Sequence, residues 1–431
     1  MAEVVVIGGG WAGCAAALSA AKAGARVTLV ERTDSLLGTG LVGGIMRNNG
    51  RYTATEEAIA MGAGELFHLT DQAARHRDLA FPGHRHATLY DISRVEPMVR
   101  RALRAMGINI LLECRATETV HRHGVLEGIV LEEGKDRKRF RLTADAFVEA
   151  TGTAGPQSNC ARYGNGCVMC ILRCPTFGGR VSIASRAGVK ELLAYAATGS
   201  PGSMSGSCKL HKDSLAPAIR EALDKTGLAI VPVPKDMQQR DSLVLKACQQ
   251  YALRAYVENI ILLDTGHAKL MTSYFPLEKL RQIPGLENAR FEDPYAGGRG
   301  NSMRYWAISP HDDSLRVKGL ENLFCAGEKA GPLVGHTEAI VTGTLAGHNA
   351  VRVAAGREPL VLPTTLAIGD AIACVGSRML YPDGLRQRFT FSGSVYFERM
   401  KQLGLYTLDR QEIAARVRQA GLERVFARAI L

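Results

Sequence analysis

The chain has 431 residues, of which 46% are hydrophobic and 22% are charged, a balance typical of a globular enzyme and not of a disordered or fibrous protein. No apolar run approaches the roughly 18 residues that a membrane-spanning helix needs, and no basic segment precedes an apolar stretch at the N-terminus, so we expect neither a membrane span nor a signal peptide. A net charge of +11 suits an anionic partner such as RNA, but the chain lacks an aromatic-rich RNA-recognition signature. By default we expect a cytoplasmic protein whose ten cysteines do not form structural disulfides.

The first stretch of the chain carries a dinucleotide-binding pattern. A β-branched run predicts a buried parallel strand, and Gly8, Gly10 and Gly13 follow it with the G-x-G-x-x-G spacing. A helix that begins near Trp11 offers its N-terminal N–H groups to phosphate oxygens. A second strand ends at Glu31, about 20 residues on, where a carboxylate binds a ribose diol. We therefore predict FAD or NAD binding by Gly8, Gly10, Trp11, Ala12, Gly13, Glu31 and Arg32.

The next hundred residues predict further elements of the same domain. A glycine-rich loop with Gly38 and Thr39 lets the backbone approach a ligand, and residues 55–79 are expected to be helical. Ser93 is expected to cap an amphipathic helix that ends at Gly107. Alternating polar and apolar residues from Ala116 to Leu131 and from Arg139 to Val148 predict an antiparallel meander, which leads to Glu149-Ala150-Thr151-Gly152.

This order of elements resembles the glutathione-reductase-like flavoproteins. The resemblance implies that Ala150, Thr151 and Gly152 return the chain towards the FAD pyrophosphate and ribityl chain. It also implies that the backbone near Ala116 faces the adenine. Residues 156–300 depart from this plan, and we expect them to form an inserted substrate domain.

A second FAD half-site is expected far along the chain. Leu323 to Glu328 predicts a short buried strand that ends in glycine and an acid, and Gly335 to Ala339 begins the helix that follows. The N-terminus of that helix offers positive potential to the flavin N1/O2 edge. The predicted cofactor-binding residues here are Gly327, Glu328, His336 and Thr337.

The C-terminal motifs resemble one superfamily more narrowly. Residues 283–291, 323–327, 335–347 and 362–369 are similar to the glucose-inhibited division protein A superfamily, which includes the flavin- and folate-dependent tRNA uracil methyltransferases. Those methyltransferases carry a nucleophilic cysteine after the first FAD motif, whereas the matching residues 43–49 contain none here. They also carry a tyrosine where this chain has His336.

Four cysteines cluster in the expected inserted domain. Cys160 is followed by Cys167, Cys170 and Cys174 with a C-x2-C-x3-C-P spacing that matches the back half of a bacterial ferredoxin motif. One interpretation is a four-iron cluster held by all four thiolates, which exchanges electrons with the flavin. The alternatives are a redox-active dithiol of Cys167 and Cys170, structural zinc, or buried thiols.

Three histidines are candidates for proton transfer or substrate contact. His336, at the start of the flavin-facing helix, is either a proton donor near the flavin or a residue that only packs. His84 and His86 follow a Pro-Gly pair, and we expect both in an exposed loop.

Together these patterns predict an α/β fold with a discontinuous FAD-binding domain of the glutathione-reductase type. The expected parts are residues 1–155 and 301–370 for FAD binding, 156–300 for the inserted α+β domain and 371–431 for a basic helical tail. The predicted function is a FAD-dependent oxidoreductase in which the cysteine cluster exchanges electrons with the flavin, with Cys167, Cys170 and His336 as catalytic residues. Its partner is a small molecule such as a reduced folate, or an electron-transfer partner, and NAD(P)H is the expected reductant. The alternatives are an RNA uracil methyltransferase that uses folate and FAD, and a non-catalytic flavin-binding subunit; we expect a homo-oligomer in each case.

Overall fold

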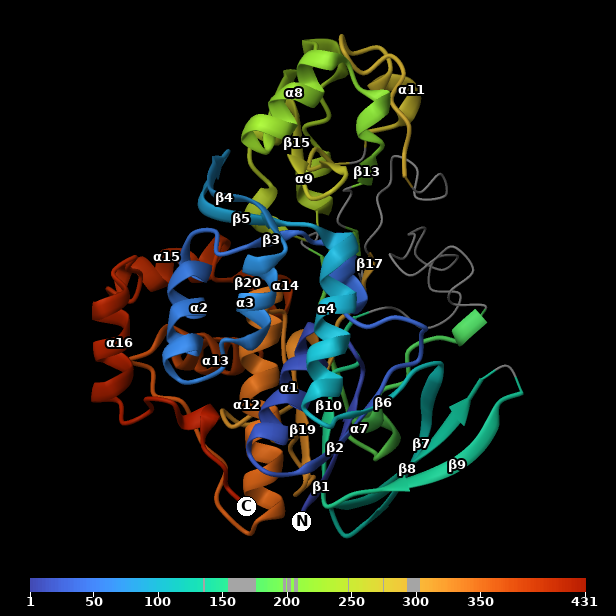
Figure 1. The fold of residues 1–431 in the computed structure, drawn as a ribbon, viewed down its shortest axis with the longest axis vertical. Coiled ribbons are helices and arrows are strands. Elements are labelled where there is room, and N and C mark those ends of the chain that lie inside the picture. The colour runs from blue at the N-terminus through green and yellow to red at the C-terminus, as the bar shows by residue number, and fades with distance from the viewer. Residues whose placement is uncertain are drawn as a thin grey trace.

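The structure is a computed structural model, and it describes residues 1–134, 136–153, 176–196, 199, 203–204, 208–246, 248–273, 275–292 and 303–431. A five-stranded parallel sheet lies at its centre, with the strand order β19-β10-β1-β2-β6 (Figure 1). Its strands are β1 (Glu3–Ile7), β2 (Arg26–Val30), β6 (Asn109–Leu111), β10 (Ala146–Glu149) and β19 (Leu323–Cys325). The glycine turn that follows β1 therefore lies at the middle of the sheet's carboxyl edge, the edge at which α/β sheets bind ligands.

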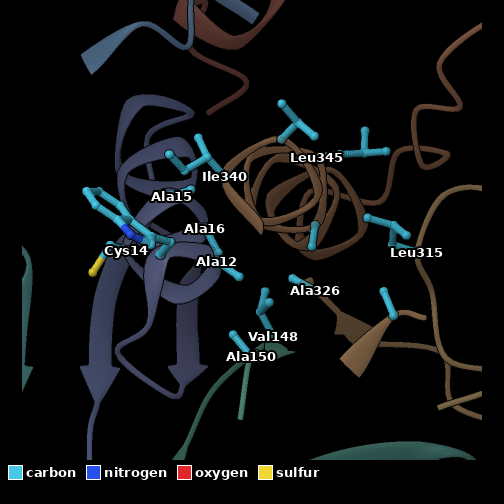
Figure 2. Packing of buried hydrophobic residues seen from close by; sticks show 14 of the residues in the cluster. Ala12, Cys14, Ala15, Ala16, Val148, Ala150, Leu315, Ala326, Ile340 and Leu345 are labelled. Atoms are coloured by element: carbon cyan, nitrogen blue, oxygen red, sulfur yellow. The ribbon is translucent and has the colours of Figure 1, made fainter. Parts of the chain in front are cut away.

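Two helices from opposite ends of the chain pack tightly against each other on this sheet. These are α1 (Trp11–Lys22) and α12 (His336–Ala354). A Cβ on Gly343 would stand 2.1 Å from the carbonyl oxygen of Ala12, and one on Gly347 would stand 2.1 Å from that of Ala16. Figure 2 shows Ala12 and Ala16 between the two helices. The glycines on α12 thus allow the backbones to approach closely, and this crossing fixes the start of α12 beside the start of α1.

The predicted antiparallel meander is present as β7 (Cys114–Arg122), β8 (Val125–Glu133) and β9 (Lys138–Thr143). The end of the predicted alternation differs, because β10 pairs in parallel with β1 and β19 in the central sheet. All four residues of β10 are buried, as expected of a strand covered on both faces.

The prediction that residues 55–79 are helical holds for residues 55–60 and 65–72 but is wrong for residues 74–79. The chain forms α2 (Gly50–Ala60) and α3 (Glu65–Gln72), and then β4 (Ala74–Phe81) pairs with β5 (His84–Tyr90). The β4–β5 pairing contains register shifts, which remove the regular alternation by which a strand is recognised. His84 is consequently not in an exposed loop, since it lies on β5 and is only 2% exposed; His86, on the same strand, is partly exposed.

The helix α4 (Ile92–Ala105) begins two residues earlier than predicted. Its N-cap is Asp91, whose Oδ1 accepts a hydrogen bond from the backbone N–H of Ser93 at 3.0 Å. Ser93 is therefore not the cap, although its hydroxyl also donates to Asp91.

A second body, at the top of Figure 1, is built on a four-stranded antiparallel sheet. Its strands, in the order β13-β16-β15-β14, are β13 (Cys208–Leu210), β14 (Leu228–Pro232), β15 (Asn259–Asp264) and β16 (Ala268–Leu270), and helices α8 (Pro217–Thr226) and α11 (Leu277–Leu280) cover it. One face buries a core of its own around Leu223, Leu262 and Phe275. On the other face, Ile261 and Leu263 pack with residues of β3 (Ile45–Met46) and β5. That second contact joins this body to the FAD-binding part of the fold.

The C-terminal helices pack onto the rest of the molecule. They are α13 (Ala367–Arg378), α14 (Pro382–Arg386), α15 (Ser394–Gln402) and α16 (Arg410–Gln419). Glu57 on α2 accepts hydrogen bonds from the backbone N–H groups of Ala367 and Ile368 at 2.8 and 3.0 Å, and so caps α13. Burial raises the pKa of Glu57 to about 7.

The remaining short elements are α7 (Ile183–Arg186), α9 (Ser242–Leu245), α10 (Ala255–Glu258), β11 (Leu192–Leu193), β12 (Ser203–Met204), β17 (Met303–Arg304), β18 (Ala307–Ile308) and β20 (Phe389–Thr390). Among the helices that the structure describes, none combines the length and the apolar character needed to cross a membrane.

Candidate functional site

A cavity lies at the carboxyl edge of the central sheet. Its walls come from the loops after β1 and β10, the segment from the end of β2 to α2, the loop and helix start after β19, and the second body. The predicted cofactor-binding residues on its walls are Gly8, Gly10, Trp11, Ala12, Glu31, Arg32, Gly38, Thr39, Ala150, Thr151, Gly152, Gly327, Glu328 and His336. The opening glycine turn and the distant Gly327–Ala339 segment therefore meet at one cavity.

The glycine turn is shaped by close backbone contacts. Gly8 has a φ of +104°, and a Cβ at this position would stand 2.4 Å from the carbonyl oxygen of Ala150. A Cβ on Gly13 would stand 1.7 Å from the carbonyl oxygen of Gly8, so Gly13 allows α1 to pack on the turn and does not line the cavity. At Gly10 a Cβ would meet no atom within 4 Å, which leaves the backbone accessible from the cavity.

Glu31 is held in place by the backbone around it. Its Oε2 accepts a hydrogen bond from the N–H of Gly9 at 2.7 Å, and its Oε1 accepts from the N–H and the hydroxyl of Thr33 at 2.8 and 2.9 Å. A carboxylate has about four acceptor positions, so one remains for a hydroxyl donor in the cavity. Arg32, the next residue, donates to the carbonyl oxygen of Gly178.

The loop after β10 approaches the cavity from the other side. Gly152 has a φ of +67°, and a Cβ there would meet no atom within 4 Å. The Thr151 hydroxyl donates to Oε1 of the buried Glu149 at 2.9 Å, which fixes the direction of the loop. The open space beside Gly10 and Gly152, the start of α1 and the carboxylate of Glu31 together fit the phosphates and ribose of FAD.

The start of α12 is built around a buried ion pair. Arg51 on α2 donates from Nε to both carboxylate oxygens of Glu338 at 3.1 Å, and Glu338 also accepts from the N–H of Phe391 at 2.9 Å. Gly335, with a φ of +145°, leaves room for this pair, because a Cβ there would stand 2.0 Å from Oε2 of Glu338. The N-terminus of α12 is therefore a rigid wall of the cavity.

His336 lines the cavity between three neighbours. Its Nδ1 is 3.2 Å from the hydroxyl of Tyr90, and its ring lies 6.1 Å from that of Trp11. The same ring occupies the space where Gly43 would carry a side chain. His336 is thus positioned for contact with a bound ligand, and its role in proton transfer stays a prediction.

Several predicted site residues do not line the cavity. Ala116 is buried within β7, and the hydroxyl of Thr337 points to the sulfur of Met46 at 3.8 Å. The four clustered cysteines, Cys160, Cys167, Cys170 and Cys174, lie outside the described residues. Within the described part of the chain, no group of three or more metal-binding side chains occurs.

The second body contributes cavity residues that sequence reasoning did not find. These are Lys246, Cys248, Gln250, Tyr251, Lys269 and Met271. Burial lowers the pKa of Lys246 to about 8 and that of Lys269 to about 7, and attraction to Cys248 opposes the fall in both. The sequence signal was slight: Lys269 is a single cation in an apolar strand, and Lys246 and Cys248 lie in a segment without clear periodicity.

Two family models match this chain, and both agree with the geometry of the cavity. Residues 3–155 match the family model described as FAD dependent oxidoreductase, and residues 262–358 match the model described as Glucose inhibited division protein A. Together the two matches support the predicted resemblance to the glucose-inhibited division protein A superfamily of FAD-dependent oxidoreductases. The first model spans the glycine turn and the second spans the start of α12.

Curated relatives match only part of the chain. Methylenetetrahydrofolate–tRNA-(uracil-5-)-methyltransferase TrmFO of Streptococcus sanguinis is 42% identical over 92 residues, which are 21% of this chain and 20% of that protein. The tRNA uridine 5-carboxymethylaminomethyl modification enzyme MnmG of Desulfotalea psychrophila is 39% identical over 105 residues, which are 23% of this chain and 15% of that protein. The chain thus covers a fifth or less of the length of these relatives.

The fold has a solved counterpart. A crystal structure of Aquifex aeolicus GidA superposes with a TM-score of 0.66 at 17% sequence identity, covering 99% of this chain and 73% of that chain. The likeness confirms the predicted α/β architecture with a glutathione-reductase-type FAD-binding domain.

Proposed function

We propose that this protein is a FAD-dependent enzyme that modifies uracil in RNA, with methylenetetrahydrofolate as the carbon donor. The names of the two relatives describe modification of tRNA uracil or uridine, and a net charge of +11 suits a polyanionic substrate. The observation that carries the proposal is Cys248. This thiol lies in the same cavity as the dinucleotide-binding residues and interacts electrostatically with Lys246 and Lys269.

Cys248 supports the proposal because uracil needs activation before its C5 atom can accept a carbon. A thiolate that adds to C6 sends the electrons of the C5–C6 double bond to O4, and the two ammonium groups stabilise the charge that develops there. C5 then forms a bond to the methylene carbon of the folate as the first of that carbon's two bonds to nitrogen breaks. Loss of the C5 proton breaks the second carbon–nitrogen bond, which releases tetrahydrofolate and leaves a methylene group on C5. When bound and reduced, FAD would supply the hydride that converts this methylene group to a methyl group as the thiolate leaves C6.

The position of Cys248 offers a nucleophile in place of the cysteine that is missing after the first FAD motif. The methyltransferase branch carries its cysteine after the first FAD motif, where residues 43–49 offer none here. A thiol reaches this cavity from the second body instead. His336, held beside Tyr90, is our candidate for moving a proton in the same cavity.

Transfer of labelled carbon into RNA tests the proposal. We expect the wild-type protein, with FAD, NADPH and 14C-methylenetetrahydrofolate, to label an unmodified tRNA transcript as 5-methyluridine. Cys248→Ser should abolish the label, whereas Cys374→Ser, on the partly exposed thiol of α13, should retain it. Absence of label with the wild-type protein on both tRNA and rRNA transcripts would overturn the proposal.

Electron exchange between the flavin and a cysteine cluster is the second candidate function. Two observations favour it. One is the C-x2-C-x3-C-P spacing, and the other is that described residues on both sides of the cluster in sequence lie at the cavity or contact one of its residues. On one side, Thr153 lines the cavity; on the other, Gly178 accepts a hydrogen bond from the cavity residue Arg32. An anaerobic absorption spectrum with iron and sulfide analysis tests this candidate, and a protein free of iron would leave the Cys167–Cys170 dithiol as its only form.

A further inference from the structure

Three buried polar side chains meet the cavity with hydrogen-bonding capacity that the protein does not use. Lys246, Gln250 and Lys269 are 2%, 5% and 6% exposed, and all three line the cavity together with Cys248. Burial of unsatisfied polar groups is unfavourable, so their retention at a cavity wall points to a ligand that satisfies them.

The two lysines offer spare donors. The Nζ of Lys246 donates to the carbonyl oxygen of Met271 at 2.7 Å and to Oγ of Ser273 at 2.6 Å, which uses two of its three N–H groups. The Nζ of Lys269 donates to the carbonyl oxygen of Val42, which uses one of three. Neither lysine forms an ion pair with a carboxylate of the described residues. Their remaining donors are therefore available to acceptor oxygens of a ligand.

Gln250 offers a spare acceptor beside them. Its Oε1 is buried and accepts no hydrogen bond from any described residue. The residue itself is fixed, because its carbonyl oxygen lies 3.2 Å from Nε2 of His84 and its Cβ packs against Gly393, where an added Cβ would stand 2.7 Å away. These contacts fix the backbone and Cβ of Gln250 at the cavity wall, and its Oε1 is available to an N–H donor.

We propose that Lys246, Gln250 and Lys269 form a recognition site for a cyclic imide, the N–H flanked by two carbonyl groups in a pyrimidine-2,4-dione. The N3–H of such a ring donates to Oε1 of Gln250, and its carbonyl oxygens accept from the lysines. Cytosine fits poorly, since it has no N3–H to donate to Oε1 of Gln250. The inference rests in part on the proposed function, because uracil is one ligand with this edge.

Two sources can supply this edge. One is the uracil of the RNA substrate, and the other is the pyrimidine ring of the flavin, which carries the same N3–H between two carbonyls. Either ligand places its ring in the part of the cavity that Cys248 also lines. In both ligands the group that donates to Gln250 is the N3–H, so methylation of N3 tests both.

The experiment compares each ligand with its N3-methyl form. In one arm, fluorescence anisotropy measures the binding of a nine-nucleotide oligouridylate and of the same oligomer made from 3-methyluridine. In the other arm, flavin fluorescence measures reconstitution of the apoprotein with FAD or with 3-methyl-FAD. The variants are Gln250→Leu, which removes the acceptor, and Gln250→Glu, which keeps one; Gln419→Leu, at an exposed position on α16, is the matched control.

We expect the wild-type protein and the Gln250→Glu and Gln419→Leu variants to prefer the unmethylated ligand about tenfold in at least one arm, and Gln250→Leu to lose that preference. Preference in the RNA arm assigns the site to uracil, and preference in the flavin arm assigns it to FAD. If the wild-type protein binds no oligouridylate but prefers FAD over 3-methyl-FAD, RNA modification fails and the imide site stands. The site is overturned if the wild-type protein shows no preference in either arm, or if Gln250→Leu keeps the wild-type preference.

Discussion

The ring of His336 occupies the space that a side chain at position 43 would need, since a Cβ on Gly43 would stand 1.6 Å from Cε1 of His336. This contact couples the loop after the first FAD motif to the start of α12. Because any side chain at position 43 would clash with this ring, the arrangement of the cavity requires glycine there. A substitution at Gly43 can therefore displace the His336 ring while His336 itself stays unsubstituted.

We predict that Gly43→Ala moves the His336 ring away from the hydroxyl of Tyr90 and weakens FAD binding about tenfold. Because the ring can rotate, the expected loss in stability is only about 1 kcal/mol, towards the low end for overpacking. Flavin fluorescence titration and thermal unfolding of the apoprotein measure the two effects. Gly376→Ala on α13, where a Cβ would come no closer than 3.3 Å to another atom, should leave FAD affinity unchanged and, as a change from glycine to alanine within a helix, should not lower the stability. Unaltered FAD affinity in Gly43→Ala would contradict the predicted role of the ring.

Glu31→Ala should weaken FAD binding by at least tenfold. The substitution removes the acceptor for the Gly9 N–H and for Thr33, so it disturbs the glycine turn as well as the predicted ribose contact. Flavin content after purification and the dissociation constant for FAD measure the effect. The control is Glu3→Ala, because Glu3 is a partly exposed residue of β1 that pairs with Arg26 at the surface. Wild-type flavin content in Glu31→Ala would contradict the predicted contact between Glu31 and the ribose of FAD.

The parts of the site that the sequence predicted are those written in contiguous stretches. The turn at Gly8 and Gly10 follows its strand directly, and its geometry depends on neighbours close in sequence. A family resemblance predicted that this turn and the segment with Gly327 and His336 bind the same FAD. That prediction was possible because the motif after β19 also has a recognisable local pattern. These stretches occupy the same cavity in the structure.

The remaining wall of the cavity depends on long-range packing that leaves no local pattern. Lys246 and Gln250 reach the cavity because β15 packs its Ile261 and Leu263 face against the hairpin of β4 and β5. Most of β4 was itself predicted as helix, since the register shifts in its pairing with β5 break the alternation of a strand. Asp91 was missed as the cap of α4 for a simpler reason, because Ser93 two residues later is an equally good capping residue.

Lys269→Met should stabilise the apoprotein at neutral pH by roughly 2 kcal/mol while weakening oligouridylate or FAD binding. Burial lowers the pKa of Lys269 to about 7, so the folded state holds this proton less tightly than the unfolded state, where the pKa is near 10.4. The lysine therefore costs most stability below about pH 7, and the cost declines as the pH rises towards 10.4.

Urea unfolding of the apoprotein at pH 6.5 and pH 9.5 measures this prediction. The advantage of Lys269→Met over the wild-type protein should be largest at pH 6.5 and should shrink at pH 9.5. Lys190→Met, at an exposed position, should show no such dependence on pH. A variant that is less stable than the wild-type protein at pH 6.5 would show that Lys269 holds the fold together and is not kept for a ligand.

His348→Leu should stabilise the protein by about 1 kcal/mol at pH 7 and more at pH 5. His348 on α12 is 2% exposed, and neither ring nitrogen has a hydrogen-bond partner among the described residues. Its ring packs edge-on against Phe426 at 5.2 Å, an environment that suits leucine. Replacement by an apolar side chain removes two unsatisfied polar atoms without opening a large cavity.

The pH dependence follows from the pKa of His348, which burial lowers to about 4. The unfolded chain takes up this proton near pH 6.5 and the folded chain only near pH 4, so the wild-type protein loses stability as the pH falls through that window. His348→Leu removes this part of the loss, while His84, whose pKa burial lowers to about 3, still contributes its own. Urea unfolding between pH 7 and pH 4 should show a shallower acid decline for His348→Leu and an unchanged decline for His121→Leu, at an exposed position on β7. Equal acid declines in His348→Leu and the wild-type protein would mean that His348 is protonated in the folded state above pH 6.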